Sequence, residues 1–285
     1  EFIGVVEAVG PEVKKYRPGQ RVVSPFRVSC GDCWFCRHGW PTQCAQAEGG
    51  AVFGQPPLHG AQAPYVRVPW ADGTLEPVPE DVPDEEAIFL GDIFSTGFFC
   101  AENGGVKAGD LVAVVGCGPV GLFAQMAAHL MGAAIVMAVD RVPFRLEMAR
   151  RLGSVPINAA ETDAGRQVRE LTEGRGADVV LEAVGADGGA FALAFQLVRP
   201  GGTVSMVGVP TQDTFPFPIR QGFRQDLTFK IGVCPSKNYI ARLMPLLQQR
   251  KVHLSQIVTH TVSLEEGVAM YQRFARREPG VLKVL

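Results

Sequence analysis

The stretch from Leu111 to Val139 contains no Asp, Glu, Lys or Arg, and it restricts the possible folds more than any other feature. Its length alone would allow one membrane-spanning helix. Three glycines interrupt it and an aspartate bounds each end, at Gly116, Gly118, Gly121, Asp110 and Asp140. A buried strand, a glycine turn, a buried helix and a second buried strand fit this pattern better. The sequence therefore favours an α/β domain over a membrane span.

The run Gly116-Cys117-Gly118-Pro119-Val120-Gly121 is a G-x-G-x-x-G pattern that follows the first predicted strand and opens the predicted helix. Gly116 permits the tight turn, Gly118 lets a pyrophosphate approach the backbone, and Gly121 lets helix and strand pack closely. The free amides at a helix N-terminus also favour phosphate groups. In this context the run predicts dinucleotide binding.

Asp140 stands at the end of the second predicted strand, where an acidic residue accepts hydrogen bonds from the ribose hydroxyls of a dinucleotide. A 2′-phosphate would meet this carboxylate, so Asp140 favours NAD over NADP. The neighbouring Arg141 keeps NADP open, because an arginine can accommodate that phosphate. The alternative interpretation of Asp140 is a solvated carboxylate at a strand end.

Strands and helices alternate through the second half of the chain. The predicted strands are 111–115, 134–139, 179–182 and 202–207, and the predicted helices are 119–131, 145–152, 166–172 and 189–198. Such alternation predicts a doubly wound parallel sheet with helices on its faces.

The first 90 residues read differently, with short apolar runs among many Val, Gly and Pro residues. They predict an irregular β domain with strands at 2–9, 20–23 and 64–68. Helices are expected at 80–87 and 89–101, and after residue 230 at 239–249 and 264–274, with a final strand at 281–284. A length of 285 residues fits two domains.

Four of the seven cysteines lie close together in the sequence, at Cys30, Cys33, Cys36 and Cys44. Pairs two residues apart let thiolates converge on one tetrahedral zinc ion. Disulfides are the alternative, but the total is odd and no secretory signal is visible. Because four protein ligands leave no open position, the pattern predicts a structural zinc. The three remaining cysteines are expected in the core.

The charge balance is nearly even, with 27 basic and 29 acidic residues and a net charge of −2. This balance argues against nucleic acid or an anionic membrane as the main partner. It also disfavours a zinc ribbon that binds nucleic acid, since the cysteine loop has few basic residues.

Three segments together resemble the zinc-containing alcohol dehydrogenases of the medium-chain dehydrogenase/reductase family. The opening Glu1-x2-Gly4-x5-Gly10-x2-Val13 resembles the family signature G-H-E-x2-G-x5-G-x2-V without its first two residues. The cysteine loop resembles the structural-zinc lobe. The run Asp92-Ile-Phe-Ser-Thr-Gly resembles the third catalytic-zinc ligand followed by the segment that contacts the nicotinamide. The resemblance covers essentially the whole chain.

This resemblance implies a GroES-like β domain over residues 1–94 that carries the structural-zinc lobe. It further implies a Rossmann NAD-binding domain over 95–232 and a return to the first domain over 233–285. Catalytic roles follow for Asp92 as zinc ligand, for Glu1 beside the zinc site and for Thr96. The implied cofactor contacts are Thr96, Val120, Asp140, Arg145, Val207, Val209, Ile231, Val233 and Lys283.

The first two catalytic-zinc ligands of the family would precede Glu1, as would its proton relay. The sequence is therefore expected to be a fragment of a longer polypeptide. One carboxylate does not hold a catalytic zinc. Of the histidines, His59 lies in a Gly/Pro-rich loop and is the candidate substitute, although a polar loop residue is the simpler interpretation.

The resemblance implies a cytoplasmic homo-oligomer, a dimer or tetramer, that transfers hydride between NAD and an alcohol, polyol or aldehyde hydrate. Two alternatives remain: a non-catalytic NAD-binding protein with one structural zinc, and a zinc-free quinone or enone reductase. The cysteine loop and Asp92 argue against the second. The wording around Asp92 is most similar to the formaldehyde dehydrogenase branch, but the sequence does not identify the substrate.

Overall fold

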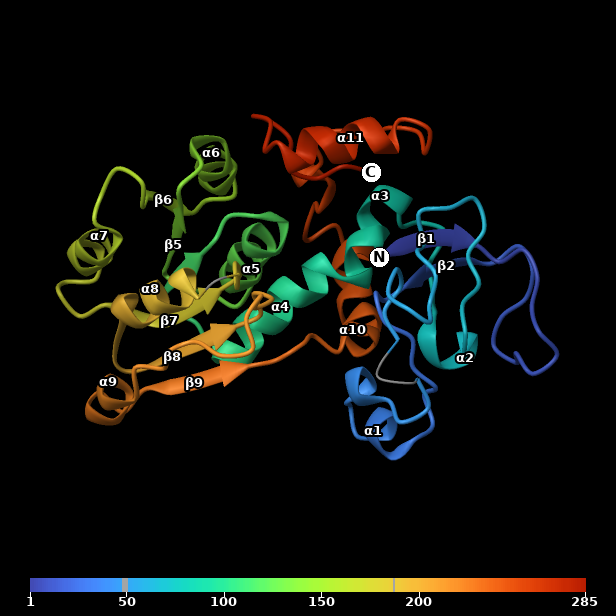
Figure 1. The fold of residues 1–285 in the computed structure, drawn as a ribbon, viewed down its shortest axis with the longest axis horizontal. Coiled ribbons are helices and arrows are strands. Elements are labelled where there is room, and N and C mark those ends of the chain that lie inside the picture. The colour runs from blue at the N-terminus through green and yellow to red at the C-terminus, as the bar shows by residue number, and fades with distance from the viewer. Residues whose placement is uncertain (48–50, 187) are drawn as a thin grey trace. The chain divides into compact units, whose positions relative to one another are not determined.

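The computed structural model describes residues 1–47, 51–186 and 188–285 (Figure 1). The chain forms two compact units. Unit 1 comprises residues 1–95, 234–276 and 284–285, and unit 2 comprises 96–233 and 277–283. The first boundary lies inside helix α4 (Ile93–Gly104). Residues 277–283 cluster with unit 2, whereas the sequence analysis expected the whole C-terminal segment in the first domain.

Unit 2 is built on a six-stranded parallel sheet in the order β6-β5-β4-β7-β8-β9, which confirms the doubly wound fold (Figure 1). Its strands are β4 (Leu111–Val115), β5 (Ile135–Asp140), β6 (Val155–Asn158), β7 (Ala177–Glu182), β8 (Val198–Met206) and β9 (Thr228–Ile231). From β4 the chain adds strands first on one side and then on the other. The order therefore reverses between β4 and β7, where sheets of this kind bind ligands.

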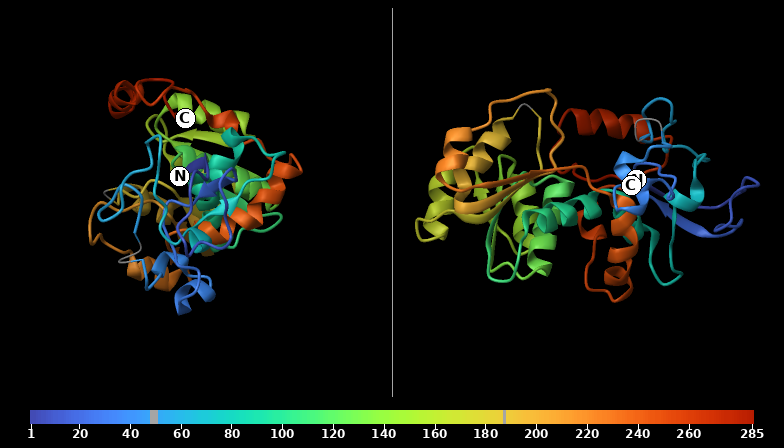
Figure 2. Two further views of the ribbon diagram at one scale, coloured as in Figure 1. Left: turned by 90° about the vertical axis from the view of Figure 1, so that its right-hand side faces the viewer. Right: turned by 90° about the horizontal axis from the view of Figure 1, so that it is seen from below.

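Helices cover both faces of this sheet (Figure 2). After α4, the helices of unit 2 are α5 (Pro119–Leu130), α6 (Pro143–Arg151), α7 (Ala164–Leu171), α8 (Gly189–Leu197) and α9 (Ile219–Arg224). On one face α7 and α8 bury Val168, Phe191 and Phe195 against the strands. On the other face α4 and α5 bury Cys100 and Ala124. Burial on both faces explains why these strands read as continuous apolar runs.

Unit 1 is less regular. Its sheet is a three-stranded antiparallel one of β1 (Phe2–Val5), β2 (Arg21–Ser24) and β3 (Glu76–Pro77). The other elements are α1 (Trp34–Arg37), η1 (Pro41–Gln43), α2 (Ala71–Thr74), α3 (Asp84–Ala87), η2 (Ile88–Gly91), α10 (Ser236–Gln248), η3 (Ser255–Ile257) and α11 (Gly267–Ala275).

Some strands predicted from the sequence are absent from the structure, and two strands of the structure were not predicted. Residues 64–68 form no strand, and β2 instead pairs with β3 at 76–77. The expected strand at 281–284 is reduced to a single bridge between His260 and Val284. Strands β6 and β9 were missed because Pro156 and Lys230 interrupt their apolar patterns.

The uncharged stretch 111–139 contains β4, α5 and most of β5, as the glycines indicated. Within the described residues, the helices are too short or too polar to traverse a bilayer.

Candidate functional site

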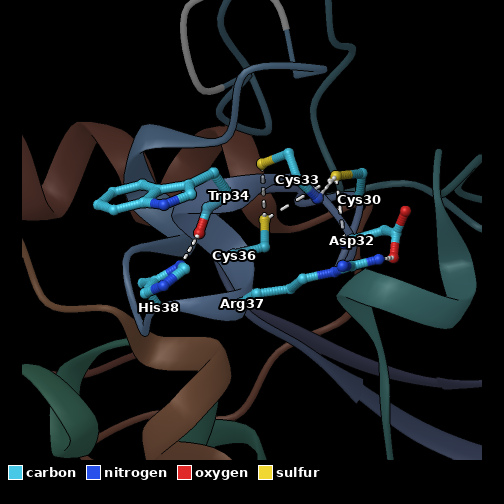
Figure 3. A network of polar contacts seen from close by, with 7 residues as sticks. All are labelled: Cys30, Asp32, Cys33, Trp34, Cys36, Arg37 and His38. Carbon is cyan, nitrogen blue, oxygen red and sulfur yellow. Dashed lines mark hydrogen bonds and ion pairs between the residues drawn. The ribbon is translucent and has the colours of Figure 1, made fainter.

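The four clustered cysteines meet in a loop around two short helical turns. Cys33 precedes α1 and Cys44 follows η1, while Cys30 and Cys36 complete the set. Gly31 and Gly39 adopt φ values of 77° and 86°, the left-handed region that glycine enters without strain. These turns fold the chain back so that the thiols face one another, and Figure 3 shows three of them, Cys30, Cys33 and Cys36.

The sulfur geometry fits a tetrahedral zinc. All four Sγ atoms lie within 4.8 Å of one another. Cys33 Sγ is 3.5 Å from Cys36 Sγ and 4.0 Å from Cys44 Sγ, and Cys30 Sγ is 3.9 Å from Cys36 Sγ. Four thiolates at a Zn–S distance of ~2.3 Å are separated by about 3.8 Å. A disulfide needs about 2.05 Å, so the spacing matches metal coordination.

Backbone amides point at these sulfurs. The N–H groups of Asp32 and Cys33 donate to Cys30 Sγ at 3.4 and 3.3 Å, and the Cys30 N–H donates to Cys44 Sγ at 3.3 Å. Amide donors from Cys36 and Ala45 lower the pKa of the Cys33 thiol to about 6, while burial raises the pKa of Cys30. Such donors stabilise the thiolate form that binds zinc.

His38 lies beside this cluster without joining it. Its ring stacks on Trp34 at 4.2 Å between centroids, and its Nδ1 lies 2.7 Å from the Trp34 carbonyl oxygen (Figure 3). The Arg37 guanidinium pairs with the Asp32 carboxylate on the same loop. The lobe is therefore a four-cysteine site with an aromatic and charged outer surface.

Asp92 follows η2, where the backbone is tightly held. A Cβ on the preceding Gly91 would stand 2.4 Å from the Ser24 carbonyl oxygen, and the Phe26 N–H donates to the Gly91 carbonyl at 3.1 Å. Glu1 Oε2 accepts from the Ile93 N–H at 3.3 Å. The structure thus brings Glu1 to the segment that carries Asp92.

Asp92, unlike the cysteine loop, has too few metal-binding side chains around it in the described part of the chain to hold a metal ion. Among the described residues the cysteines are the one group of three or more ligands, and Asp92 and His59 belong to no such group. The described residues therefore do not form a catalytic metal site around Asp92 by themselves.

The glycine loop after β4 has the shape that phosphate binding requires. Gly116 has φ 96°, and a Cβ there would stand 2.5 Å from Val184 Cγ2. A Cβ on Gly121 would meet the Gly116 carbonyl oxygen at 1.8 Å, while Gly118 faces open space at the N-cap of α5. Pro119 occupies the first turn. The backbone at Gly118 is thus open to a ligand.

Thr96 reaches this region through its neighbour Gly97. A Cβ on Gly97 would stand 2.6 Å from the Ala124 amide and 2.9 Å from the Val120 carbonyl oxygen. The close approach of α4 and α5 therefore depends on glycine, and it brings the Thr96–Gly97 step beside the turn that contains Val120.

Asp140 ends β5 and binds the glycine loop. Its Oδ2 accepts from the Cys117 N–H at 2.6 Å, and its Oδ1 accepts from the Arg141 and Val142 amides at 2.7 and 2.9 Å. Arg145 lies on α6. Burial, and then the Asp140 charge, raise the pKa of the Cys117 thiol, while the Arg145 charge lowers it. Asp140 therefore faces the loop.

The other predicted cofactor contacts lie at the carboxyl ends of β8 and β9. Val209, Ile231 and Val233 are 78%, 58% and 50% exposed, and Val207 is partly buried. Lys283 lies in the segment 277–283 that clusters with unit 2. Exposed apolar side chains at this edge of a parallel sheet are suited to an apolar ring.

Sequence analysis missed Glu182, which ends β7 and is fully buried. Its Oε1 accepts from the Val184 and Gly185 amides at 2.8 Å each, and its Oε2 has no hydrogen-bond partner. Burial raises the pKa of this carboxyl group. The signal in the sequence was a lone carboxylate that ends an apolar strand.

Comparisons with known proteins agree with this geometry. Residues 119–249 match the zinc-binding dehydrogenase family, and residues 1–80 match the alcohol dehydrogenase GroES-like domain. A zinc-type alcohol dehydrogenase-like protein of Bacillus subtilis is 37% identical over 100% of this chain and 83% of its own length. An alcohol dehydrogenase of Cupriavidus necator is 35% identical over 100% of this chain and 82% of its own length.

A solved alcohol dehydrogenase from Thermus sp. ATN1 superimposes with a TM-score of 0.94 at 43% identity, covering 100% of this chain and 83% of that one. These likenesses agree with the cysteine loop, the glycine loop and the two-unit fold of this chain. The chain belongs to the zinc-type alcohol dehydrogenases of the medium-chain dehydrogenase/reductase family, and it is an oxidoreductase.

Proposed function

We propose that this oxidoreductase transfers hydride between NAD and an alcohol, polyol or aldehyde hydrate. The observation that carries the choice of cofactor is the Asp140 carboxylate, which three backbone amides hold at the end of β5. A fixed negative charge at this position repels a 2′-phosphate and accepts hydrogen bonds from ribose hydroxyls. The neighbouring Arg141 is exposed, and its side chain is not needed to hold Asp140 in place.

Two zinc ions have different roles in the proposal. The cysteine loop would hold the structural ion, since its four thiols match the required number and spacing. Asp92 would be one ligand of the catalytic ion, which supplies Lewis-acid polarisation of the alcohol oxygen when bound. Glu1 fixes the Asp92 segment through its contact with the Ile93 amide.

The protein's own part in the reaction is to bind and align. Gly118 and the free amides at the start of α5 would hold the pyrophosphate, and Asp140 the adenosine ribose. Thr96, Val120, Val207 and Val209 would border the nicotinamide ring. When bound, NAD would accept the hydride of the carbinol carbon at that ring, and the hydroxyl proton would pass to water.

A direct test is NADH formation from NAD with a panel of primary, secondary and polyhydric alcohols, with formaldehyde as a further substrate. We expect turnover with NAD to exceed turnover with NADP. Binding of NADH without turnover of any alcohol would instead support a non-catalytic NAD-binding protein. Reduction of quinones or enones by a zinc-free preparation would support the second alternative.

We further propose a cytoplasmic homo-oligomer, a dimer or tetramer, that associates through unit 2. Strand β9 is an edge strand of the sheet, and the nearby α9 exposes Ile219 at 71% and Phe223 at 85%. Exposed edges and apolar side chains are features that proteins cover by association. Thiols that bind zinc require a reducing compartment, which favours the cytoplasm. Size-exclusion chromatography with light scattering tests the assembly.

A further inference from the structure

Glu182 lies where the order of the unit 2 sheet reverses. It is the last residue of β7, and it pairs with Val115, the residue before the glycine loop. Its side chain is 0% exposed, so it touches no solvent and can touch no cofactor directly. A carboxyl group at this depth is costly unless the fold uses it. Its surroundings indicate what that use is.

The carboxyl group of Glu182 lies between two loops. One is the loop after β7, residues 183–186, and the other is the loop after β8, residues 207–211; together they are called the paired loops. Oε1 accepts from the Val184 and Gly185 amides at 2.8 Å each. On the other side, a Cβ on Gly208 would stand 2.5 Å from Oε2. The Gly208 N–H itself donates to the backbone carbonyl of Glu182 at 3.2 Å, as the Val207 N–H does at 3.0 Å.

The paired loops are bound to each other as well. The Ala186 N–H donates to the Val209 carbonyl at 2.9 Å, and the Thr211 N–H donates to the Ala186 carbonyl at 3.0 Å. A Cβ on Gly208 would stand 2.1 Å from the Gly185 amide, so the two backbones are in close contact. Ala186 has φ 54°, a left-handed conformation that a residue with a Cβ enters under strain. The paired loops are therefore held in a shape that they would not keep alone.

The outer surface of the paired loops presents two valines. Val184 is 45% exposed and lies against the glycine loop, where it would contact a Cβ on Gly116. Val209 is 78% exposed. Val184 and Val209 belong to the two loops that contact Glu182. These loops lie at the edge of the sheet where the nicotinamide is proposed to bind.

We propose that Glu182 is a positioning residue for the nicotinamide end of the cofactor. Its buried carboxylate accepts from two amides of the loop after β7 and lies against Gly208 of the loop after β8, whose amide donates to the Glu182 backbone carbonyl. Glu182 thereby fixes Val184 and Val209 against the ring. This inference rests on the proposed NAD-dependent function, and it adds a residue that acts through the paired loops without touching the cofactor.

The natural control is Asp178, which lies in the same strand at the opposite end. Its Oδ2 accepts from the Leu111 N–H at 2.7 Å and its Oδ1 from Arg199 Nε at 2.6 Å. Asp178→Asn therefore removes a carboxylate of β7 that also holds a backbone amide, but at a place remote from the paired loops. A purely structural effect would be shared by both variants.

The test compares wild-type protein with Glu182→Gln, Gly208→Ala and Asp178→Asn. Gln removes the negative charge that the Val184 and Gly185 amides surround, and the Ala methyl would press on Oε2 and on the Gly185 amide from the other loop. For both we expect the NADH dissociation constant, from fluorescence titration, to rise about tenfold, while Asp178→Asn leaves it unchanged. The KM for NAD should rise with it, and the KM for the alcohol should not.

A second measurement needs no cofactor. Amide hydrogen exchange at 183–186 and 207–211 should be faster in Glu182→Gln and Gly208→Ala than in wild type, and Asp178→Asn should not speed exchange there more than in the rest of the sheet. Equal exchange and equal NADH affinity in wild type and Glu182→Gln would overturn the inference. If wild-type protein bound no NADH, the proposed function would fail. The exchange measurement would still test Glu182 separately, because unchanged exchange in the variants would show that Glu182 does not order the paired loops.

Discussion

The two units of this molecule reach order by different means. Unit 2 buries long apolar strands under helices on both faces, with Phe191 and Phe195 among its fully buried side chains. The cysteine loop of unit 1 has a small core of Val28, Cys44, Ala47 and Leu58, and the other three cysteines pack against it. A core this small supplies little hydrophobic stabilisation. On the proposal of a structural zinc, metal binding would do in the loop what apolar burial does in the sheet.

The largest effect that follows from this contrast is loss of the loop on zinc removal. Zinc-finger peptides bind their structural zinc with apparent free energies of about 10–16 kcal/mol, and this binding free energy stabilises their fold. We expect purified protein to hold a zinc that survives dialysis, and we expect Cys36→Ser to lose it. Limited proteolysis should then cut within 30–47 and leave unit 2 intact.

Cys234→Ser is the matched control, because Cys234 is a buried thiol of the same unit outside the cluster. It should keep both the zinc and the resistance to protease. A zinc-free protein with a protected loop would refute the role of the metal.

The next effect separates the two proposed metal sites. Asp92→Ala should lower kcat/KM for alcohols by at least about 100-fold. In metalloenzymes generally, mutation of a residue that only supports a metal ligand can already cost about that much, and Asp92 is proposed to be a ligand itself. The zinc of the cysteine loop should remain, which metal analysis of the variant would show. Asp81→Ala, at an exposed acidic position of unit 1, should retain full activity. Normal turnover by Asp92→Ala would remove Asp92 from the proposed catalytic site.

A smaller effect is expected at the glycine loop of unit 2. Asp140→Asn keeps the side-chain size but turns an amide donor toward the Cys117 N–H and removes the charge. NADH affinity should fall by about tenfold, and discrimination against NADPH should weaken. Asp163→Asn changes a carboxylate that similarly accepts from a backbone amide, that of Arg166 at 2.9 Å, and it should bind both cofactors like wild type. An unchanged NADH to NADPH affinity ratio in Asp140→Asn would exclude Asp140 as the selector.

The smallest effect concerns the stability of the sheet. Burial alone would raise the pKa of Asp178, but the Leu111 amide and Arg199 outweigh it, so the pKa is lowered. A lowered folded-state pKa contributes stability above the unfolded pKa and loses it as the pH falls through the folded value. Asp178→Asn should therefore destabilise by about 1–2 kcal/mol at neutral pH. In urea titrations the difference from wild type should shrink on acidification, and a constant difference would contradict this account.

The sequence predicted unit 2 far better than unit 1, for a physical reason. Strands buried on both faces are continuous apolar runs, and β4 and β5 are evident as such. In unit 1 the strands are short and half exposed, so 64–68 resembled a strand although β2 takes its partner from residues 76–77. Local pattern does not reveal which distant segment completes a small sheet.

The candidate site divides in the same way. Ligand spacing within one loop predicted the four-cysteine cluster, and the order strand, glycine loop, helix, strand predicted the place of Asp140. Glu182 was missed because its role depends on Gly208, a residue of a different loop that approaches its carboxylate only in the folded sheet. Residues that act through tertiary packing leave little trace in a single sequence.

The division of the chain also has a consequence for its synthesis. All six strands of unit 2 lie within residues 111–231, so the sheet of this unit can form as soon as that segment has left the ribosome, although residues 277–283 join it later. Unit 1 closes later, because Lys237 must reach Glu76 and Ser255 must reach Glu86. A nascent chain stalled near residue 233 would therefore carry a finished sheet and an open first unit. Translation beyond that point completes unit 1 from both ends of the chain.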